Sequence, residues 1–413
     1  MTTMYQRVLS LLMVLLLGMQ MVSVGMKNQP KETEIAVERP LLIWYTDPDI
    51  QTYMEEAAAE TAVKYGIEVH AELVSEVDYI EHISRESVKE QMAGPDVYVA
   101  SSALLEKAVL AGLVKPVSDA GMEENYSEKA VQAVTYDGKV VARPFYIETC
   151  FMLYNSSYVT EEQVPDTIED ILVYAENFET GEDTENVESI FKWNVADVIE
   201  SYMFLGAYTD LGGLNGDDKS QVSMDLEKIE ECMDYYQSLN AFFAIDADTV
   251  TSEEVVQEFA DGKIVFTIAN VPMLAELDRL SEGEVSYTVI TLPALTDELD
   301  SRGLSVTNSV VVNPYSANVE AAEDCARYLT EGRVSQLYEA AGKLSAYTNF
   351  PGERDEAYLT VYEAYEQAAE VPKIMELSNI WLQLEVVLAD IWRGASPAEE
   401  LEAFHELLEE QLD

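Results

Sequence analysis

Short polar side chains follow two of the apolar runs near the start of the sequence. Asp47 and Asp49 come directly after the first of these runs, and Ser101 and Ser102 come directly after the third. Carboxylate and hydroxyl groups at such positions can exchange hydrogen bonds with the hydroxyl groups of a polar ligand. The alternative interpretation is structural, because Asp favours turns and Ser favours the position that caps a helix.

The apolar runs are expected to be strands of a doubly wound sheet. Residues 41–45, 67–74 and 96–100 have the length and apolar pattern of strands, and helical patterns at 50–61 and 78–92 separate them. Because parallel strands need crossover connections, this alternation predicts an α/β sheet with helices on both faces. Ligands of such sheets bind beside the carboxyl ends of the strands, which is where the polar loops lie.

The remainder of the chain mixes helices with further strands. Residues 161–280 are predicted to be mainly helical, although an apolar strand is expected at 263–268. Further strand patterns occur at 285–292 and 306–313, and residues 378–412 are predicted to be helical with an acidic amphipathic end. The chain therefore contains a second group of strands, which favours a second domain.

The chain of 413 residues is strongly acidic, with 78 Asp and Glu against 24 Lys and Arg and a formal net charge of −54. This excludes nucleic acid as an expected partner, because phosphate binding needs clustered basic side chains. The 48% of hydrophobic residues is enough for packed cores, so the charge is expected on a folded surface. Two domains are the default at this length. The acidity mildly favours cationic or neutral ligands.

Neither the cysteines nor the histidines form a recognisable site. The three of each kind are scattered along the chain: Cys150, Cys232 and Cys325, and His70, His82 and His405. This pattern predicts no disulfide framework, no metal site and no cofactor, and the cysteines are expected to be small buried hydrophobes, with a single disulfide left open.

The N-terminus has the pattern of an export segment. Arg7 precedes an apolar run at residues 8–26, and small residues before Gly25 have the spacing that a signal peptidase recognises. Residues 1–25 are therefore predicted to be a signal peptide or an uncleaved membrane anchor, and residues 26–40 a polar tether. The segment has no cysteine, so a lipoprotein anchor is not expected. The mature chain is expected outside the cytoplasm and in contact with the membrane only through this segment.

Several motifs occur in a known order along the chain. They are GLVKPV at 112–117, YDGKVVARP at 136–144, ETCFMLYN at 148–155, FADGKIVFTI at 259–268, LP at 292–293, VVVN at 310–313, AA at 321–322 and the stretch from Trp381 to Gly394. This succession resembles the maltose-type extracellular solute-binding proteins of ABC sugar transporters, and it extends over nearly the whole mature chain.

The resemblance implies a two-lobed, type II periplasmic-binding-protein-like α/β fold, with a doubly wound sheet in each lobe and a hinged cleft between them. The first lobe is expected to contain residues 41–147 and about 306–345. The second is expected to contain residues 148–305 and about 346–413. The family pattern implies that the chain crosses between the lobes three times, at strands that can act as a hinge.

The resemblance also implies ligand-binding residues. Trp381 matches a stacking aromatic at the start of a C-terminal helix, and Glu148 matches a hinge glutamate that faces the cleft. Trp193 and Asp197 lie in the stretch that resembles the binding segment of the second lobe. The structural alternatives are a packed tryptophan at 381 and a solvated strand carboxylate at 148.

Two further candidates, Asn270 and Met273, follow the strand expected at 263–268. Met273 stands where the maltose-binding pattern has a cleft tryptophan, and Ser101 and Ser102 replace an aromatic and charged loop. These departures argue against maltose itself and leave other oligosaccharides open.

The function implied by the resemblance is capture of a neutral oligosaccharide and its delivery to the membrane permease subunits of an ABC importer, by a monomer that performs no chemistry on the ligand. A protein of the same fold that binds a polyamine, a peptide or a metal chelate is the first alternative. A glycan-acting enzyme is the second, because 78 acidic residues always allow some carboxylate pair, although no GxSxG nucleophile motif is present.

Overall fold

The computed structural model describes residues 39–89, 93–118, 121–182, 184–281, 285–349 and 355–412. The predicted export or anchor segment at 1–25, and the tether at 26–40 apart from its last two residues, lie outside the described residues. From Leu41 onward the chain folds as one compact unit. Over the described ranges, no helix combines the length and the apolar character that crossing a membrane requires.

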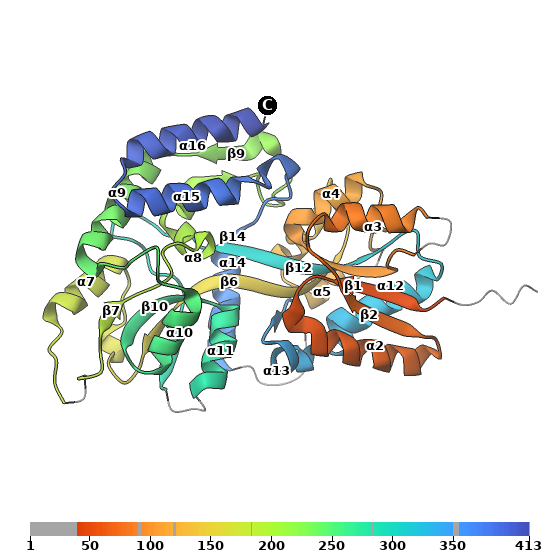
Figure 1. Cartoon of the computed structure of the whole chain (residues 1–413), viewed down its shortest axis with the longest axis horizontal. Coiled ribbons are helices and arrows are strands. Elements are labelled where there is room, and N and C mark those ends of the chain that lie inside the picture. Colours follow the sequence, from red (N-terminus) through yellow and green to blue (C-terminus); the bar gives the residue numbers. More distant parts are fainter. Residues whose placement is uncertain are drawn as a thin grey trace, which may run out of the picture. The chain divides into compact units, whose positions relative to one another are not determined.

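The elements alternate along the chain much as the sequence predicts (Figure 1). The strands are β1 (Leu41–Tyr45), β2 (Val69–Leu73), β3 (Val97–Ser101), β4 (Thr135–Tyr136), β5 (Lys139–Val140), β6 (Arg143–Asn155), β7 (Ser189–Phe191), β8 (Thr209–Leu211), β9 (Val222–Met224), β10 (Ile264–Asn270), β11 (Tyr287–Ile290), β12 (Leu304–Val312), β13 (Leu344–Ser345) and β14 (Ala369–Glu370). The helices are α2 (Gln51–Tyr65), α3 (Tyr79–Ser87), α4 (Leu105–Leu110), α5 (Met122–Asn125), α6 (Glu128–Ala133), α7 (Ile168–Asn177), α8 (Val198–Ser201), α9 (Leu226–Phe243), α10 (Ser252–Ala260), α11 (Val271–Ser281), α12 (Val319–Arg327), α13 (Leu337–Ala341), α14 (Glu356–Gln367), α15 (Ile380–Trp392) and α16 (Pro397–Leu412).

The first three strands form the parallel arrangement expected from the sequence. β1 pairs in parallel with β2 along its whole length and with β3 at Ile43 and Trp44. The sheet order is β2-β1-β3-β12-β6-β10-β7, so β12 enters antiparallel to β3 from a much later part of the chain. Helix α2 ends where Gly66 adopts a left-handed φ of 65°, and the Gly66 N–H caps the helix by donating to the carbonyl of Ala62 at 2.9 Å.

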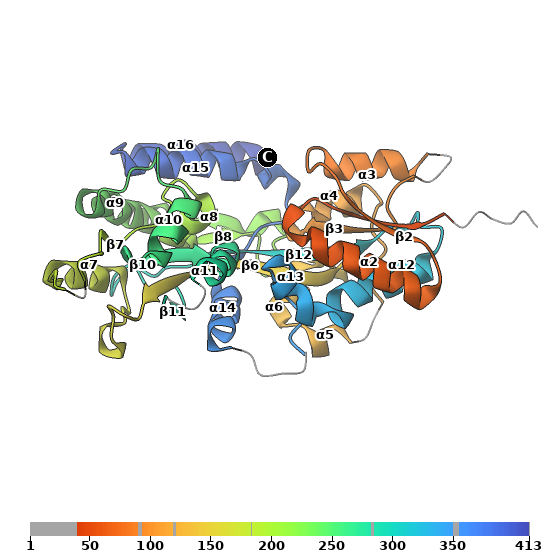
Figure 2. The same cartoon turned by 60° about the horizontal axis from the view of Figure 1, so that its bottom comes forward.

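Both faces of this half-sheet are covered. Ile43 and Tyr45 point to a core shared with Met54 of α2 and with α12, whereas Trp44 points to the opposite core, which includes Tyr79 of α3. The two views show α2 and α12 on one side of β1, away from α3 and α4 (Figures 1 and 2). Burial on both faces explains why β1 and β3 are apolar runs in the sequence, whereas the edge strand β2 contains the polar residues His70 and Glu72.

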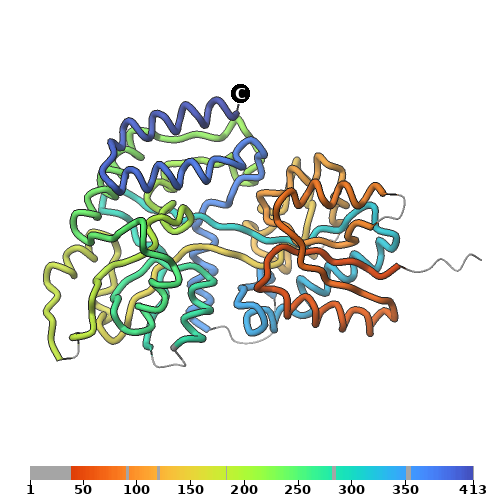
Figure 3. Tube along the Cα trace, viewed as in Figure 1, coloured from red at the N-terminus to blue at the C-terminus, as the bar shows by residue number. Residues whose placement is uncertain are grey.

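The longest strand, β6, belongs to two groups of strands. Up to Thr149 it pairs with β12 and β13, and from Cys150 onward it pairs with β10 and β11. β6 and β12 run side by side between the red-to-orange part of the chain and the green part (Figure 3). Their pairing shifts register between Asn308 and Ser309, as a β-bulge does where a strand is redirected. The lobe boundaries proposed from the sequence stay a prediction about which residues move together.

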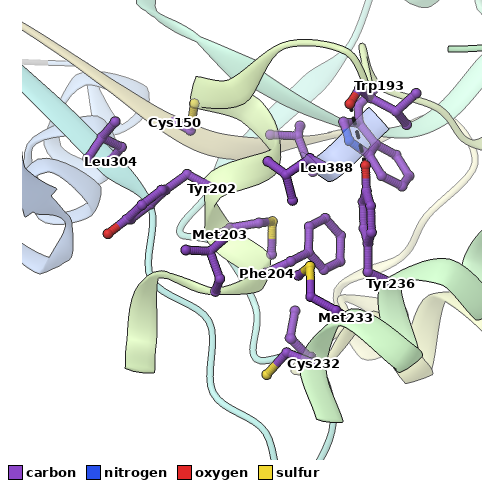
Figure 4. Packing of buried hydrophobic residues seen from close by; sticks show 14 of the residues in the cluster. Cys150, Trp193, Tyr202, Met203, Phe204, Cys232, Met233, Tyr236, Leu304 and Leu388 are labelled. Carbon is purple, nitrogen blue, oxygen red and sulfur yellow. Dashed lines mark hydrogen bonds between the residues drawn. The ribbon is translucent and has the colours of Figure 1, made fainter. Parts of the chain in front are cut away.

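A further core, beneath the second group of strands, is rich in aromatic side chains. The fully buried Trp193 ring stacks on Phe191 and Phe204 at centroid distances of 4.7 and 5.7 Å and meets Trp392 edge-on at 5.3 Å. Figure 4 shows Trp193 at close quarters with Phe204 and Tyr236. All three cysteines are buried and free, so the expectation of small buried hydrophobes is confirmed and the disulfide is absent.

A half-buried carboxylate, Glu370, joins β14 to β12 and to the residue that follows β3. Glu370 accepts hydrogen bonds from the Ser102 hydroxyl at 2.8 Å and the Thr307 N–H at 2.7 Å through Oε1, and from the Ser305 hydroxyl at 2.7 Å through Oε2. Each donor is buried. Ser101 occupies the N-cap position of the following 3₁₀ turn, Ser102–Leu104, but its side chain makes no capping hydrogen bond. Ser102 is not a cap, because its hydroxyl donates to Glu370.

Replacement of this carboxylate should destabilise the protein strongly. We expect Glu370→Ala to lower the free energy of unfolding by about 3–5 kcal/mol, because three buried donors lose a charged acceptor. Urea denaturation measures the change. The exposed Glu363→Ala on α14 is the control and should stay within about 0.5 kcal/mol of the wild type; equal effects of the two substitutions would contradict the interpretation.

Candidate ligand-binding site

Three of the predicted acidic residues converge on one lysine. The Nζ of Lys343 lies 3.0 Å from Asp47 Oδ2, 3.3 Å from Asp49 Oδ2 and 3.2 Å from Glu148 Oε1. The Tyr146 hydroxyl also donates to Asp47 Oδ2, at 2.9 Å. The structure thus brings Glu148 together with Asp47 and Asp49, from which it is about one hundred residues distant in the sequence.

Local structure explains how the lysine reaches this position. Helix α13 ends at Gly342, whose φ of 64° is left-handed, and a Cβ at this glycine would lie 2.8 Å from the Cβ of Ala275. The chain then enters β13, where Leu344 pairs with Ile147 of β6. This pairing holds Lys343 next to Glu148.

The acidic partners are placed by the turn that follows β1. Asp47 precedes a single 3₁₀ turn, Pro48–Ile50, and its Oδ1 accepts the N–H of Asp49 at 2.9 Å. The structural interpretation of Asp47 as a turn residue is therefore confirmed. Its second oxygen remains available to the cluster, so the same side chain serves the turn and the site.

The electrostatics of the cluster keep Lys343 charged. Burial alone would lower its pKa, but the carboxylates of Glu148, Asp47 and Asp49 outweigh burial and raise the pKa above its usual value. Burial raises the pKa of Tyr146 well above its usual value, and the charges of Asp47 and Glu148 add to the effect. Tyr146 therefore stays protonated and donates its hydrogen bond at any physiological pH.

A cavity of about 320 Å³ opens beside this cluster. It is lined by Thr46, Asp47, Pro48, Glu76, Tyr79, Val99, Ala100, Ser101, Leu104, Tyr146, Glu148, Val306 and Asn308. The lining combines carboxylates, hydroxyls and an amide with apolar and aromatic surface, and the volume is within the range of small-ligand pockets. The cavity lies at the carboxyl ends of β1 and β3, where the α/β topology predicts a ligand.

Other predicted site residues lie in cores or serve structural contacts. Trp193 is buried in the aromatic-rich core that also contains Trp392, and Met273 is buried in the core that contains Trp44 and Tyr79. Ser102 is buried against Glu370. Asn270 is the last residue of β10, and its Oδ1 accepts the N–H of Met273 at 3.0 Å at the start of α11. These four do not line the cavity beside Lys343. The side chain of Asn270 serves the first turn of α11.

Asp197 and Trp381 lie on the second group of strands and helices. Asp197 caps α8 by accepting the N–H groups of Ile199 and Glu200 at 2.8 and 3.2 Å. Trp381, near the start of α15, is partly exposed and lies edge-on to Tyr202 with a centroid distance of 6.1 Å. Neither lines the cavity beside Lys343.

Sequence reasoning missed two ionisable groups near the predicted residues. Lys343 has no motif that links it to Asp47, since only the fold brings them together.

Glu200 is fully buried next to Asp197, and it accepts hydrogen bonds from the Ser252 hydroxyl at 2.7 Å and the Asn194 N–H at 3.1 Å. Burial, reinforced by the charge of Asp197, raises the pKa of Glu200 to about 8. A single glutamate in an acidic chain carries no sequence signal of this kind.

A larger cavity of about 450 Å³ lies around Lys129 and Arg302. Lys129 donates to the carbonyls of Tyr365 and Ala368, and Arg302 donates to that of Gln367, so both cations cap the end of α14. Burial lowers the pKa of Lys129 to about 8. None of the site residues predicted from the sequence lines this cavity, so the cavity beside Lys343 is the better candidate.

Comparison with known families decides the classification. The family model described as bacterial extracellular solute-binding protein matches residues 53–367, well over half of the chain. The chain belongs to this family. The family resemblance predicted from the motifs is thereby confirmed, and bacterial extracellular solute-binding proteins are binding proteins rather than enzymes.

Curated members of this family are similar along much of their length. The maltodextrin-binding protein MdxE of Bacillus subtilis is 23% identical over 66% of each chain. A maltooligosaccharide ABC transporter solute-binding lipoprotein of Streptococcus pneumoniae is 23% identical over 93% of this chain and 92% of its own.

Solved structures confirm the two-lobed, type II fold. An extracellular solute-binding protein from Staphylococcus aureus in complex with maltose superposes with a TM-score of 0.74 at 18% identity, over 90% of this chain and 97% of the other. A cyclo/maltodextrin-binding protein complexed with maltotetraose superposes with the same TM-score and identity, over 92% and 99% of the two chains. At this identity the likeness concerns the fold alone.

The buried Glu200 should make stability depend on pH. Its pKa of about 8 in the folded protein exceeds the ordinary 4.5, so the folded state holds the proton more tightly and the stabilisation is lost as pH rises from 4.5 to 8. We expect Glu200→Gln to become more stable than the wild type across this interval, by up to about 4 kcal/mol.

Urea denaturation at several pH values checks this. The exposed Glu253→Gln on α10 is the matched control and should follow the wild type at every pH. A constant difference between Glu200→Gln and the wild type from pH 4.5 to 8 would show that Glu200 is ionised throughout.

Proposed function

We propose that this protein is the substrate-binding component of an ABC importer and that it binds a neutral oligosaccharide in the cavity beside Lys343. The ligand is released unchanged to the membrane permease, so the protein is not an enzyme. The protein acts as a monomer outside the cytoplasm. Its N-terminal segment directs export and either is removed or holds the protein at the membrane.

Membership of the bacterial extracellular solute-binding proteins is the observation that carries this proposal. The names of the similar proteins support the ligand class, since they include maltodextrin-binding, maltooligosaccharide-binding and galactooligosaccharide-binding proteins. Two of the superposable structures contain maltose and maltotetraose. The name of the Streptococcus pneumoniae relative includes the ABC transporter itself.

The chemistry of the cavity also suits a sugar. Glu148 and Ser101 offer an acceptor and a hydroxyl to sugar hydroxyl groups, Asn308 offers an amide, and Tyr79 contributes aromatic surface. Glu148 lies on β6 one residue before the strand changes partners, so a ligand bound there contacts the segment that joins the two groups of strands. We infer that ligand binding favours a closed arrangement of the lobes, within the limit of its differential affinity for that arrangement.

Calorimetry with a panel of ligands tests the proposal. We expect maltotetraose or a galactooligosaccharide to bind the purified chain from Asn28 onward, and spermidine to bind no more tightly than its attraction to the acidic surface explains. Small-angle scattering of the same samples should show a smaller radius of gyration with the sugar. Preferential binding of spermidine, or the appearance of new reducing ends, would replace the proposal with the polyamine-binding or the enzymatic alternative.

Trp381 does not line the cavity beside Lys343, and we propose that the closed arrangement of the lobes brings it to the sugar as a stacking aromatic. We expect Trp381→Ala to weaken binding of the active sugar by about 1–3 kcal/mol, because an aromatic face and its stacking geometry are lost. Leu382→Ala, an exposed neighbour on α15, should leave the affinity unchanged. A large fall in melting temperature with unchanged affinity would instead assign Trp381 to the core, where it already packs near Tyr202.

A further inference from the structure

We propose that Lys343 is a positioning residue whose ammonium group is a built-in cation: it fixes the carboxylates of Asp47, Asp49 and Glu148 and fills the place that a cationic ligand would take. The site is thereby set for the hydroxyl groups of a neutral ligand. The ligand part of this inference rests on the proposed function, whereas the role of the ammonium group does not.

The ammonium group is surrounded by carboxylates. Lys343 Nζ lies 3.0–3.3 Å from three carboxylate oxygens, and it donates a hydrogen bond to one of them, Glu148 Oε1, at 3.2 Å. The side chain is only 5% exposed, so these contacts are shielded from solvent. Without the lysine, three like charges would face one another around an empty position.

The same contacts leave selected oxygens for a ligand. Both oxygens of Asp47 are engaged, Oδ1 by the Asp49 N–H and Oδ2 by Tyr146 and Lys343. Asp49 and Glu148 each give one oxygen to Lys343, and within the described residues the second oxygen of each accepts no hydrogen bond. Their side chains are 61% and 33% exposed. Glu148, which lines the cavity, therefore keeps one oriented acceptor for a ligand, and Asp49 keeps another outside the cavity lining. Acceptors of this kind suit the donors of a sugar hydroxyl.

The charge of the cluster supports the same conclusion. The three carboxylates carry three negative charges, and the lysine reduces the sum to two. Nζ of Lys343 already occupies the position among the three carboxylates at which the electrostatic attraction for a ligand ammonium would be strongest. The overall acidity of the chain favours cationic ligands, but the occupied position opposes them at this site.

Chemical rescue tests the role of the ammonium group. Lys343→Ala removes the side chain beyond Cβ, and propylammonium has the three carbons and the ammonium that are missing. We expect propylammonium to raise the melting temperature of Lys343→Ala in a concentration-dependent manner, because a ligand bound only by the folded state stabilises it. Tetramethylammonium has the same charge but no N–H donor. It should therefore raise the melting temperature only as far as screening of the acidic surface does.

Two controls separate the site from the surface. The wild type and Lys228→Ala, whose lysine is exposed and paired with Glu231, should respond equally to both cations. If Lys343→Ala does not fold, Lys343→Met keeps the stem and lacks only the terminal nitrogen, and the ammonium ion then replaces propylammonium. Equal responses of the Lys343 variant to the donor-bearing cation and to tetramethylammonium would overturn the proposal.

A second measurement addresses the ligand. We expect Lys343→Ala to bind maltotetraose about 10-fold to 100-fold more weakly than the wild type, and propylammonium to restore most of the loss. Rescue of stability together with a failure of the wild type to bind any sugar would refute the proposed function and leave the role of Lys343 standing. Unchanged sugar affinity in Lys343→Ala would refute the positioning of the ligand acceptors.

Discussion

The pairing of β6 with β12 is the constraint on which the rest of the structure depends. β12 pairs with β3 of the parallel half-sheet, and β6 continues from its pairing with β12 to pair with β10 of the second group of strands. Successive side chains of a strand point to opposite faces of the sheet, so a slip of one residue in this pairing would turn Glu148 away from Val306 and Asn308 of β12, with which it lines the cavity. The candidate site therefore depends on this register.

Buried cations gather close to this pairing although the chain is strongly acidic. Lys343 meets three carboxylates, Lys129 caps the end of α14, and the fully buried Lys373 donates to the carbonyls of Gln132 and Asn215. Burial lowers the pKa of Lys373 to about 8. Each cation joins segments distant in sequence, and a buried charge that loses its partner is costly, so these contacts specify the arrangement of the junction.

Family membership and ligand identity rest on different parts of the chain. The matched region and the superposed structures follow the sheets and their helices, which form the frame shared by the family. The ligand depends on the side chains at the strand ends, and there Met273 replaces an expected aromatic and is buried in a core. A frame shared by the family therefore does not decide the ligand of this chain.

The sequence by itself determined the strands of the first half-sheet, the helices that cover it and the family, since apolar periodicity and motif order are local properties. It also proposed Asp47, Asp49 and Glu148 as candidate ligand-binding residues, and the structure brings these three together. Only the tertiary structure decided that Lys343 joins them, that Trp193 lies in a core and that Ser102 serves Glu370. Such contacts connect residues far apart in the chain, and a local pattern carries no information about the distances between them.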